Sequence, residues 1–249
     1  MTDTDRLAAR SATGRSATGR STTGRSAQAQ LSRTRPARRR ERGEETRALL
    51  LDEAERLFAA HGFHGVGLAA LATASGLGNA GLLHHFPSKA RLYGAVLARV
   101  GAELDALLDA ALADAPNPRA AARAMVRLQA TWTAERPQGA RLVLRELLDN
   151  VDRVGRARSL PLAGYVDRMC RVIEAAQAAG HVAAGPVVLP LTQLLGSFAY
   201  ALAVRPTFAQ MRPQDAVLAS DAAFAQALVA VAEAALFTGG HAHADPDAP

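Results

Sequence analysis

The sequence predicts an all-α protein of about nine helices, because three features of its pattern agree. From residue 44 onward, apolar residues recur at three- and four-residue spacing, which is the period of one helix face. No segment alternates apolar and polar residues between turn pairs, as a half-buried strand does. Glycine and proline separate the periodic segments into helices of ordinary length.

Three short helices are expected first, at Thr46 to Ala60, Leu68 to Ala74 and Asn79 to Phe86. Gly62 is placed to end the first helix, and Gly76 supplies a tight turn between the second and the third. This arrangement is the outline of a helix-turn-helix, in which the last helix enters the major groove of DNA.

A long amphipathic helix is expected next, from Ser88 to Leu112, with leucine and valine at steady four-residue spacing. At about 35 Å it is long enough to join two domains. Five further helices are expected, at Pro118 to Glu135, Ala140 to Arg153, Leu160 to Ala179, Pro186 to Ala203 and Asp215 to Phe237. The last two are apolar over much of their girth, so that either a partner subunit or a single-chain core covers them.

The positive charge lies at the N-terminus. Residues 1–43 hold eleven arginines and three carboxylates, a net charge of +8, so with the whole chain at +6 the other residues carry −2. The segment repeats RSATG and RSTTG and has little to bury, which predicts disorder. The denser run from Arg33 to Arg42 is either a solvated extension or an arm that follows DNA phosphates.

Composition argues against several other classes of protein. The single cysteine, Cys170, excludes an intramolecular disulfide framework and suits a reducing cytoplasm, where we expect the protein to act. We interpret Cys170 as a small buried hydrophobe rather than a redox switch. The first residues lack the apolar stretch of a secretory signal, and no run of about 18 uncharged apolar residues predicts a membrane span.

Two stretches carry a family resemblance: TRALLLDEAERLFAAHGF, and LAALATASGLGNAGLLHHFPSKARLYGAVL. They resemble the DNA-binding domain of the TetR family of transcriptional regulators, over about Glu44 to Glu103. The residues in register with the family are Phe58, Gly62, Phe63, Leu71, Ala72, Gly76, Leu82, His85, Phe86, Ser88, Lys89 and Leu92.

Charge and composition assign a disordered basic tail to 1–43 and a flexible tail to 241–249. The resemblance implies a DNA-binding domain at 44–104, with its helix-turn-helix at about 67–86, and an effector-binding and dimerisation domain at 105–240. It implies a homodimer that pairs through its last two helices and binds palindromic double-stranded operator DNA. A small-molecule effector would release this DNA, so the protein is expected to be a repressor. The alternative is a DNA-binding regulator or architectural protein without small-molecule gating.

The DNA contacts that we expect come from the motif and its flanks: Gly67, Leu68, Ala69, Gly78, Asn79, Ala80, Gly81, Leu83, His84, His85 and Lys89. Asn79 can pair bidentately with an adenine edge, while Ala80 and Gly81 offer close approach or contact with a thymine methyl. The resemblance implies that His84, His85 and Lys89 face the DNA backbone and that Phe86 packs inward.

The chain departs from the family pattern at several of these positions. Val66 and Gly67 stand where the family has the hydroxyl that caps the second helix, and Gly78 replaces the turn serine. Gly81 weakens the third helix by about 1 kcal/mol relative to alanine. Leu83 replaces the tyrosine that commonly meets a phosphate, so this phosphate contact is in doubt.

Candidates for the effector pocket are the large, soft or aromatic residues Met125, Leu128, Trp132, Tyr165, Met169, Cys170 and Phe198, which suggest an apolar effector, although each fits a plain core position better than a pocket wall. No cofactor or metal is expected: His84 and His85 lie about 100° apart on a helix and do not readily chelate one ion together.

A helical enzyme would need acid and base groups, for which Glu146, Asp149, Asp152 and His181 are the candidates. Their spacing is that of solvated helix faces, and no nucleophile motif or phosphate-binding loop accompanies them. The sequence therefore favours a regulator over an enzyme.

Overall fold

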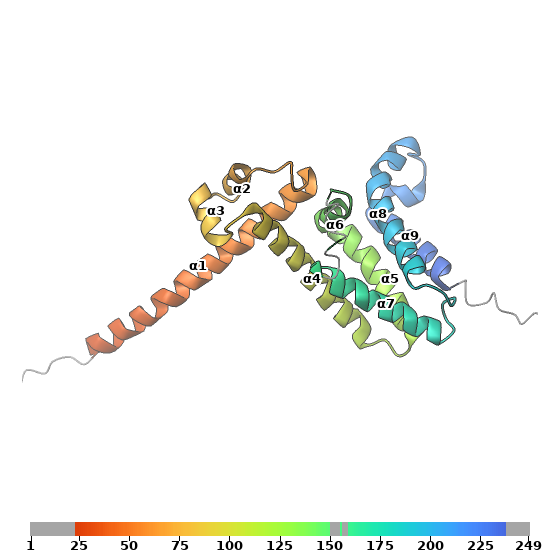
Figure 1. The fold of residues 1–249 in the computed structure, drawn as a ribbon, viewed down its shortest axis with the longest axis horizontal. Helices are drawn as coiled ribbons and strands as arrows, with labels where there is room; N and C mark the ends of the chain where they lie inside the picture. Colours follow the sequence, from red (N-terminus) through yellow and green to blue (C-terminus); the bar gives the residue numbers. More distant parts are fainter. Residues whose placement is uncertain (1–22, 150–154, 156–158, 238–249) are drawn as a thin grey trace, which may run out of the picture. The chain divides into compact units, whose positions relative to one another are not determined.

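A computed structural model describes residues 23–149, 155 and 159–237, and every regular element in these ranges is helical, which confirms the all-α prediction. Contacts divide the chain into two compact units, residues 1–46 and 47–249. The elements, coloured along the chain in Figure 1, are α1 (Thr23–His61), α2 (Leu68–Ala74), α3 (Asn79–His85), α4 (Lys89–Ala113), α5 (Pro118–Glu135), α6 (Pro137–Asp149), α7 (Ala163–Ala178), α8 (Val188–Met211), η2 (Ala216–Ala219) and α9 (Asp221–Phe237).

Helix α1 begins well before the predicted start at Thr46. It runs from Thr23, so the expected disorder of residues 1–43 does not hold for residues 23–43. Beyond the glycine-containing repeats, this segment is rich in alanine, glutamine and arginine, which are strong helix formers. The repeats up to residue 22 and the tail at 241–249 lie outside the described residues.

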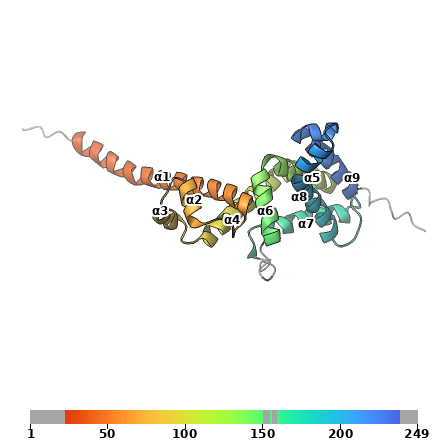
Figure 2. The same ribbon diagram turned by 90° about the horizontal axis from the view of Figure 1, so that it is seen from above.

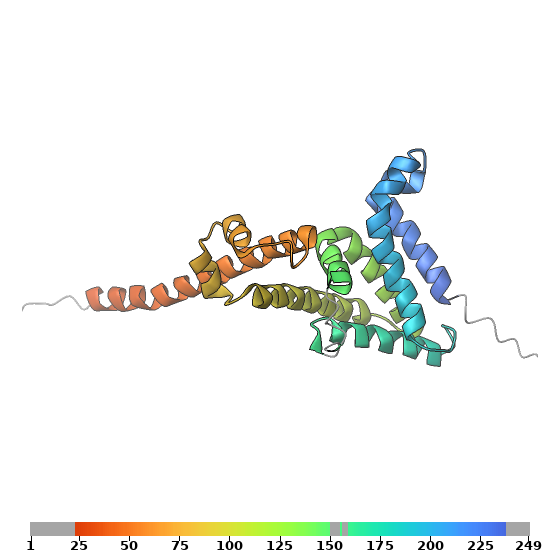
Figure 3. The ribbon, with the colours of Figure 1, turned by 45° about the horizontal axis from the view of Figure 1, so that its top comes forward.

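Helix α8 also extends further than predicted, because it continues through Pro206 to Met211. Among the described residues, it has the length and mean hydropathy that a membrane span needs, and 22% of its most apolar window is buried inside the protein. It packs against α5, α6, α7 and α9, and Figure 3 shows it beside α9. Length and hydropathy alone do not distinguish a membrane span from the core helix of a folded domain.

The turns at the helix-turn-helix follow from two glycines. Gly62 has φ of 71°, and its N–H donates to the Phe58 carbonyl at 2.8 Å, which ends α1. Gly76 has φ of 67°, and the Leu77 N–H reaches back to the Ala72 carbonyl at 2.8 Å. The bond from the Leu77 N–H to the Ala72 carbonyl is the long-range bond of a Schellman motif. The left-handed conformation of Gly76 makes this bond possible. Both predicted glycine turns are confirmed.

One contiguous hydrophobic core extends from Leu50 on α1 to Leu236 on α9. Helix α5 contacts α4, α6, α7, α8 and α9, and Figure 2 shows α6 beside α5. The regular leucines and valines of α4 are buried along its length. Because α4 contributes to the core throughout, residues 47–249 show no break at the expected boundary near residue 104, and that boundary remains a functional prediction.

Candidate nucleic-acid interface and effector cavity

Helices α2 and α3 bury one face each. Leu71, Ala72, Leu82 and Phe86 are at most 4% exposed and anchor the two helices to the core. Of the expected DNA contacts, Gly67, Ala69, Gly78, Asn79, Ala80, Leu83 and His84 are exposed, and Leu68, Gly81, His85 and Lys89 are half-buried. The face of α3 opposite its buried leucine is therefore open to a partner.

The N-termini of both helices have glycine caps with no side-chain hydrogen bond, as the sequence indicates. Gly67 precedes α2 and Gly78 precedes α3, each with an extended backbone. By contrast, Ser88 caps α4, where its hydroxyl oxygen accepts from the Arg91 N–H at 3.2 Å. The first turns of α2 and α3 therefore have no hydroxyl at the cap position.

Lys89 has internal partners that the sequence did not indicate. Its Nζ donates to the carbonyls of Phe63 at 2.9 Å and Val66 at 3.0 Å, and lies 4.4 Å from the centre of the Phe63 ring. The amine therefore joins the start of α4 to the loop between α1 and α2. We expected Lys89 to contact a DNA phosphate. In the structure, its ammonium instead donates hydrogen bonds to the loop that leads into α2.

The end of α3 gathers aromatic and basic side chains. The rings of His84 and His85 are 5.5 Å apart and roughly perpendicular, and Leu83 is 41% exposed beside them. Arg47 on α1 stacks its guanidinium over the Phe86 ring at 5.0 Å. Arg47 is exposed and was missed from the sequence, because its helical position alone does not show that it lies over the end of α3.

A charged cluster joins α1, α4 and the turn after α5. The Glu55 carboxylate, whose side chain is 4% exposed, pairs with Arg99 at 2.8 Å and with Arg136 at 3.1 Å. Arg136 also binds Glu103 at 2.9 Å, and the Trp132 indole N–H donates to the same carboxylate at 3.1 Å. These contacts connect α1 and α4 to the end of α5.

Helix α6 contacts both α1 and α4. Arg145 donates from Nε to the Ala59 carbonyl and from Nη2 to the Ala60 carbonyl, each at 2.9 Å. These carbonyls belong to the last turn of α1, which has no helical partner for them. The Tyr93 hydroxyl on α4 donates to Glu146 at 2.7 Å, and burial together with this hydrogen bond raises the pKa of Tyr93 well above its usual value. Tyr93 therefore remains a neutral donor.

The predicted pocket residues mostly pack in the core. Met125, Trp132, Tyr165, Met169 and Phe198 are buried, and Leu128 and Cys170 lie half-buried against them. The Tyr165 hydroxyl donates to Gln129 at 2.9 Å, and burial raises the pKa of this phenol. Burial also raises the pKa of the Cys170 thiol, which lowers its reactivity.

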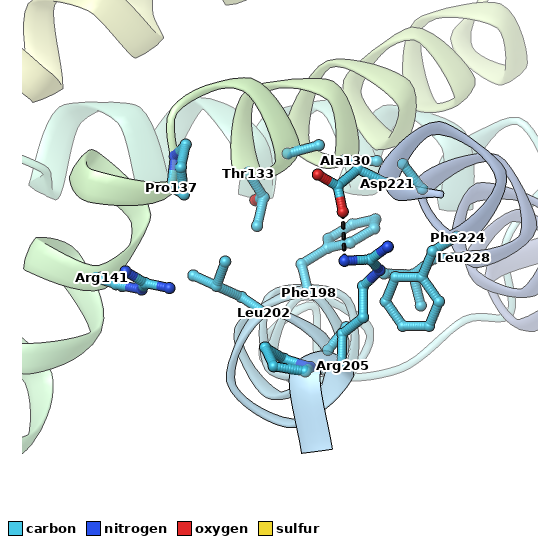
Figure 4. A pocket seen from close by; sticks show the side chains of 14 residues that line it. Ala130, Thr133, Pro137, Arg141, Phe198, Leu202, Arg205, Asp221, Phe224 and Leu228 are labelled. Atoms are coloured by element: carbon cyan, nitrogen blue, oxygen red, sulfur yellow. Dashed lines mark ion pairs between the residues drawn. The ribbon is translucent and has the colours of Figure 1, made fainter. Parts of the chain in front are cut away.

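Phe198 alone among these seven lines a cavity of about 260 Å³ between α5, α6, α8 and α9. The wall is mostly apolar, with Leu202 and Phe224 among its side chains, and Figure 4 shows the residues around it. The polar groups include Arg205, which forms an ion pair with Asp221. The sequence did not indicate this cavity, because its lining comes from four helices that are distant along the chain.

The groups considered for an enzyme have structural contacts. Glu146 accepts from Tyr93, and Asp149 lies 3.7 Å from the Arg145 guanidinium. His181 follows the end of α7, and Asp152 lies outside the described residues. Within the described ranges, no three histidine, cysteine or acidic side chains gather as metal ligands.

Comparisons with known proteins agree with this geometry. Residues 50–96 match the family model described as bacterial regulatory proteins, tetR family. A putative tetR family transcription regulator from Shewanella sp. PV-4 is 23% identical with a TM-score of 0.60, covering 77% of this chain and 97% of that chain. A TetR family regulator from Marinobacter aquaeolei VT8 is 18% identical with a TM-score of 0.62, covering 79% and 98%.

A third similar structure is AibR in complex with isovaleryl coenzyme A and operator DNA, at 19% identity and a TM-score of 0.60, covering 77% of this chain and 98% of that chain. No match was found among curated proteins. The matched segment contains the C-terminal part of α1, all of α2 and α3 and the start of α4, which are the elements of the helix-turn-helix. Residues 50–96 thus match the TetR family, and the described helices have the fold of TetR family transcription regulators.

Proposed function

We propose that the protein is a sequence-specific DNA-binding regulator, and that it is a repressor released from a palindromic operator by a small molecule. The observation that supports this proposal is the exposed face of α3, held in place by buried Leu82 and Phe86 within the matched segment. Helix α3 enters the major groove, and the start of α2 approaches the backbone.

Within this interface, Asn79 at the first turn of α3 reads a base, since its amide can bond an adenine edge bidentately. Ala80 and Gly81 allow close approach, and His84 and His85 face phosphates. We now assign Lys89 to positioning, because its amine holds the Phe63 and Val66 carbonyls beside α2.

A homodimer formed through α8 and α9 presents two copies of α3 to successive major grooves, about 34 Å apart. Exposed apolar side chains on these helices support this assignment: Val188, Leu189, Tyr200, Phe208 and Met211 on α8, and Val231 on α9. Single exposed apolar side chains are common on protein surfaces. Six large apolar residues on two neighbouring helices instead favour a surface that binds a partner subunit.

Release of DNA requires a ligand that binds one conformation of the dimer better than the other. Helix α6 is our candidate for the coupling element. Its Arg141 lines the cavity of about 260 Å³, while Arg145 and Glu146 on the same helix hold α1 and α4. In AibR, a related fold has been solved with both a ligand and operator DNA.

Replacing Leu83 by tyrosine tests the placement of α3. Leu83 is 41% exposed, and a phenol at this position would add a hydrogen bond to a phosphate. We expect Leu83→Tyr to tighten DNA binding by about 1 kcal/mol, or roughly fivefold, measured by fluorescence anisotropy. Leu83→Phe is the matched control without the hydroxyl, and equal affinities for the two variants would contradict this orientation.

The basic part of α1 offers a second test. Arg38, Arg39 and Arg40 are exposed. If they follow the backbone, replacing all three by glutamine in the full chain makes log K less dependent on log salt, by about 0.9 for each phosphate that is no longer neutralised. The readout is operator affinity across a salt series. An unchanged slope would assign these arginines to a solvated extension.

A further inference from the structure

The cavity between α5, α6, α8 and α9 combines cationic groups with an apolar wall. Arg141 enters from α6 and Arg205 from α8, and Asp221 is the one carboxylate among its lining residues in the described ranges. Phe198 and Phe224 contribute aromatic rings, and Figure 4 shows Arg205 beside Asp221 and Phe224. The lining therefore has a net positive charge in apolar surroundings.

Arg205 is only partly satisfied by its protein partners. Its guanidinium pairs with Asp221 and donates from Nη2 to the Leu218 carbonyl at 3.3 Å, but its Nε is buried and has no hydrogen-bond partner in the described residues. The Asp221 side chain is 79% exposed, so water screens the ion pair and it contributes little. A buried N–H donor without an acceptor is unfavourable, so Arg205 retains a capacity for a further acceptor.

Arg141 supplies a second positive charge at the cavity. No ion pair or hydrogen bond to its guanidinium occurs in the part of the chain that the structure describes. An anion that enters the cavity would therefore meet Arg141 without displacing an existing partner. A carboxylate also matches the planar fork of Arg205, because its two oxygens accept two parallel N–H groups.

We infer that this cavity binds an apolar monocarboxylic acid, whose carboxylate takes the place of Asp221 at Arg205 and whose body lies against Phe198, Leu202 and Phe224. This inference rests on the proposed function in treating the acid as the effector. The volume of about 260 Å³ suits a small acid. A single anionic end and a hydrophobic body match the two parts of the lining.

The position of Arg141 connects binding to regulation. It lies one turn before Arg145, which holds the Ala59 and Ala60 carbonyls at the end of α1. A carboxylate that attracts Arg141 therefore acts on the same helix that supports the DNA-binding segment. Asp221 is the first residue of α9, and α9 is one of the two helices of the proposed dimer surface. A ligand that displaces the Asp221 carboxylate from Arg205 therefore changes a contact of that helix.

The experiment is calorimetric titration of the full chain, without DNA, using octanoate and phenylbutyrate as probes. Octan-1-ol and phenylbutanol are the matched neutral compounds. We expect each acid to bind at least tenfold more tightly than its alcohol. Equal binding of acid and alcohol, or no detectable binding of either acid, would overturn the inference.

Two variants assign the effect to Arg205. Arg205→Met is expected to remove the preference for acid over alcohol, and Asp221→Asn to strengthen acid binding severalfold, since the competing carboxylate is gone. Arg212→Gln, on an exposed arginine just beyond α8, is the control and should bind as the wild type does. If Arg205→Met does not fold, the Asp221→Asn variant tests the inference by itself. Weaker or unchanged acid binding by Asp221→Asn would contradict the proposal that the ligand carboxylate displaces Asp221 from Arg205.

DNA affinity is measured separately, without acid. An unaltered chain that recognises a specific DNA sequence but binds acid and alcohol equally would reject this inference alone. Acid-selective binding by a chain that does not recognise any DNA sequence would instead reject the proposed function and leave the cavity assignment standing.

Discussion

Glu55→Ala is expected to lower the free energy of unfolding by about 2 kcal/mol. The Glu55 carboxylate is nearly buried and holds Arg99 and Arg136 together, and breaking a buried ion pair typically costs about 3–5 kcal/mol. The two arginines are 30% and 38% exposed, so water partly solvates them once Glu55 is removed, which reduces the cost. For a chain of this size the melting temperature should fall by about 4–8 °C.

Asp52→Ala is the matched control, because Asp52 also pairs with Arg99, but its own side chain is 66% exposed. We expect that variant to change stability by no more than about 0.5 kcal/mol. Thermal unfolding followed by circular dichroism compares the two. Similar melting temperatures for Glu55→Ala and Asp52→Ala would show that the cluster does not hold the helices together.

Asn79→Ala is expected to weaken binding to the selected operator by about 10- to 100-fold. A bidentate amide-to-adenine pair gives roughly 1–3 kcal/mol of discrimination, and Asn79 is the residue on the exposed start of α3 that can form one. Base preference should relax at one position in each half-site. Affinity for unrelated duplex DNA should stay within about twofold, because phosphate contacts dominate that binding.

Base preference is measured by anisotropy on a set of operators in which each base pair is changed in turn. If Asn79 only holds a phosphate, the variant will lose affinity for every duplex equally and keep the wild-type base preference. That result would move the base-reading role away from the first turn of α3.

The helical pattern predicted most of the fold, because the spacing of apolar residues determines which face of a helix is buried. This holds whichever helix packs against that face. The match of α2 and α3 to their predicted ranges, and of Gly62 and Gly76 to their turns, shows this local control. The start of α1 was missed, since charged sequences with high helix propensity carry no apolar period. In α8, the predicted end at Ala203 was wrong, because the helix continues through Pro206 to Met211.

The candidate site was less predictable, because it depends on contacts between distant residues. Nothing in the spacing of Lys89 shows that its amine lies on the Phe63 and Val66 carbonyls. In the same way, Arg205 and Asp221 meet only when α8 and α9 pack together. The exposed positions on α3 could be proposed from the resemblance, whereas the cavity required the folded arrangement of four helices.

The most direct test of the DNA-binding regulator is selection of duplexes from a random pool by the full chain, followed by sequencing. We predict enrichment of an inverted repeat whose half-sites are centred about one helical turn apart, because two copies of α3 must enter successive major grooves. Asn79→Ala should select the same repeat with one degenerate position in each half. A pool that shows no enriched sequence after repeated rounds, with folded protein, would contradict sequence-specific DNA binding by this chain.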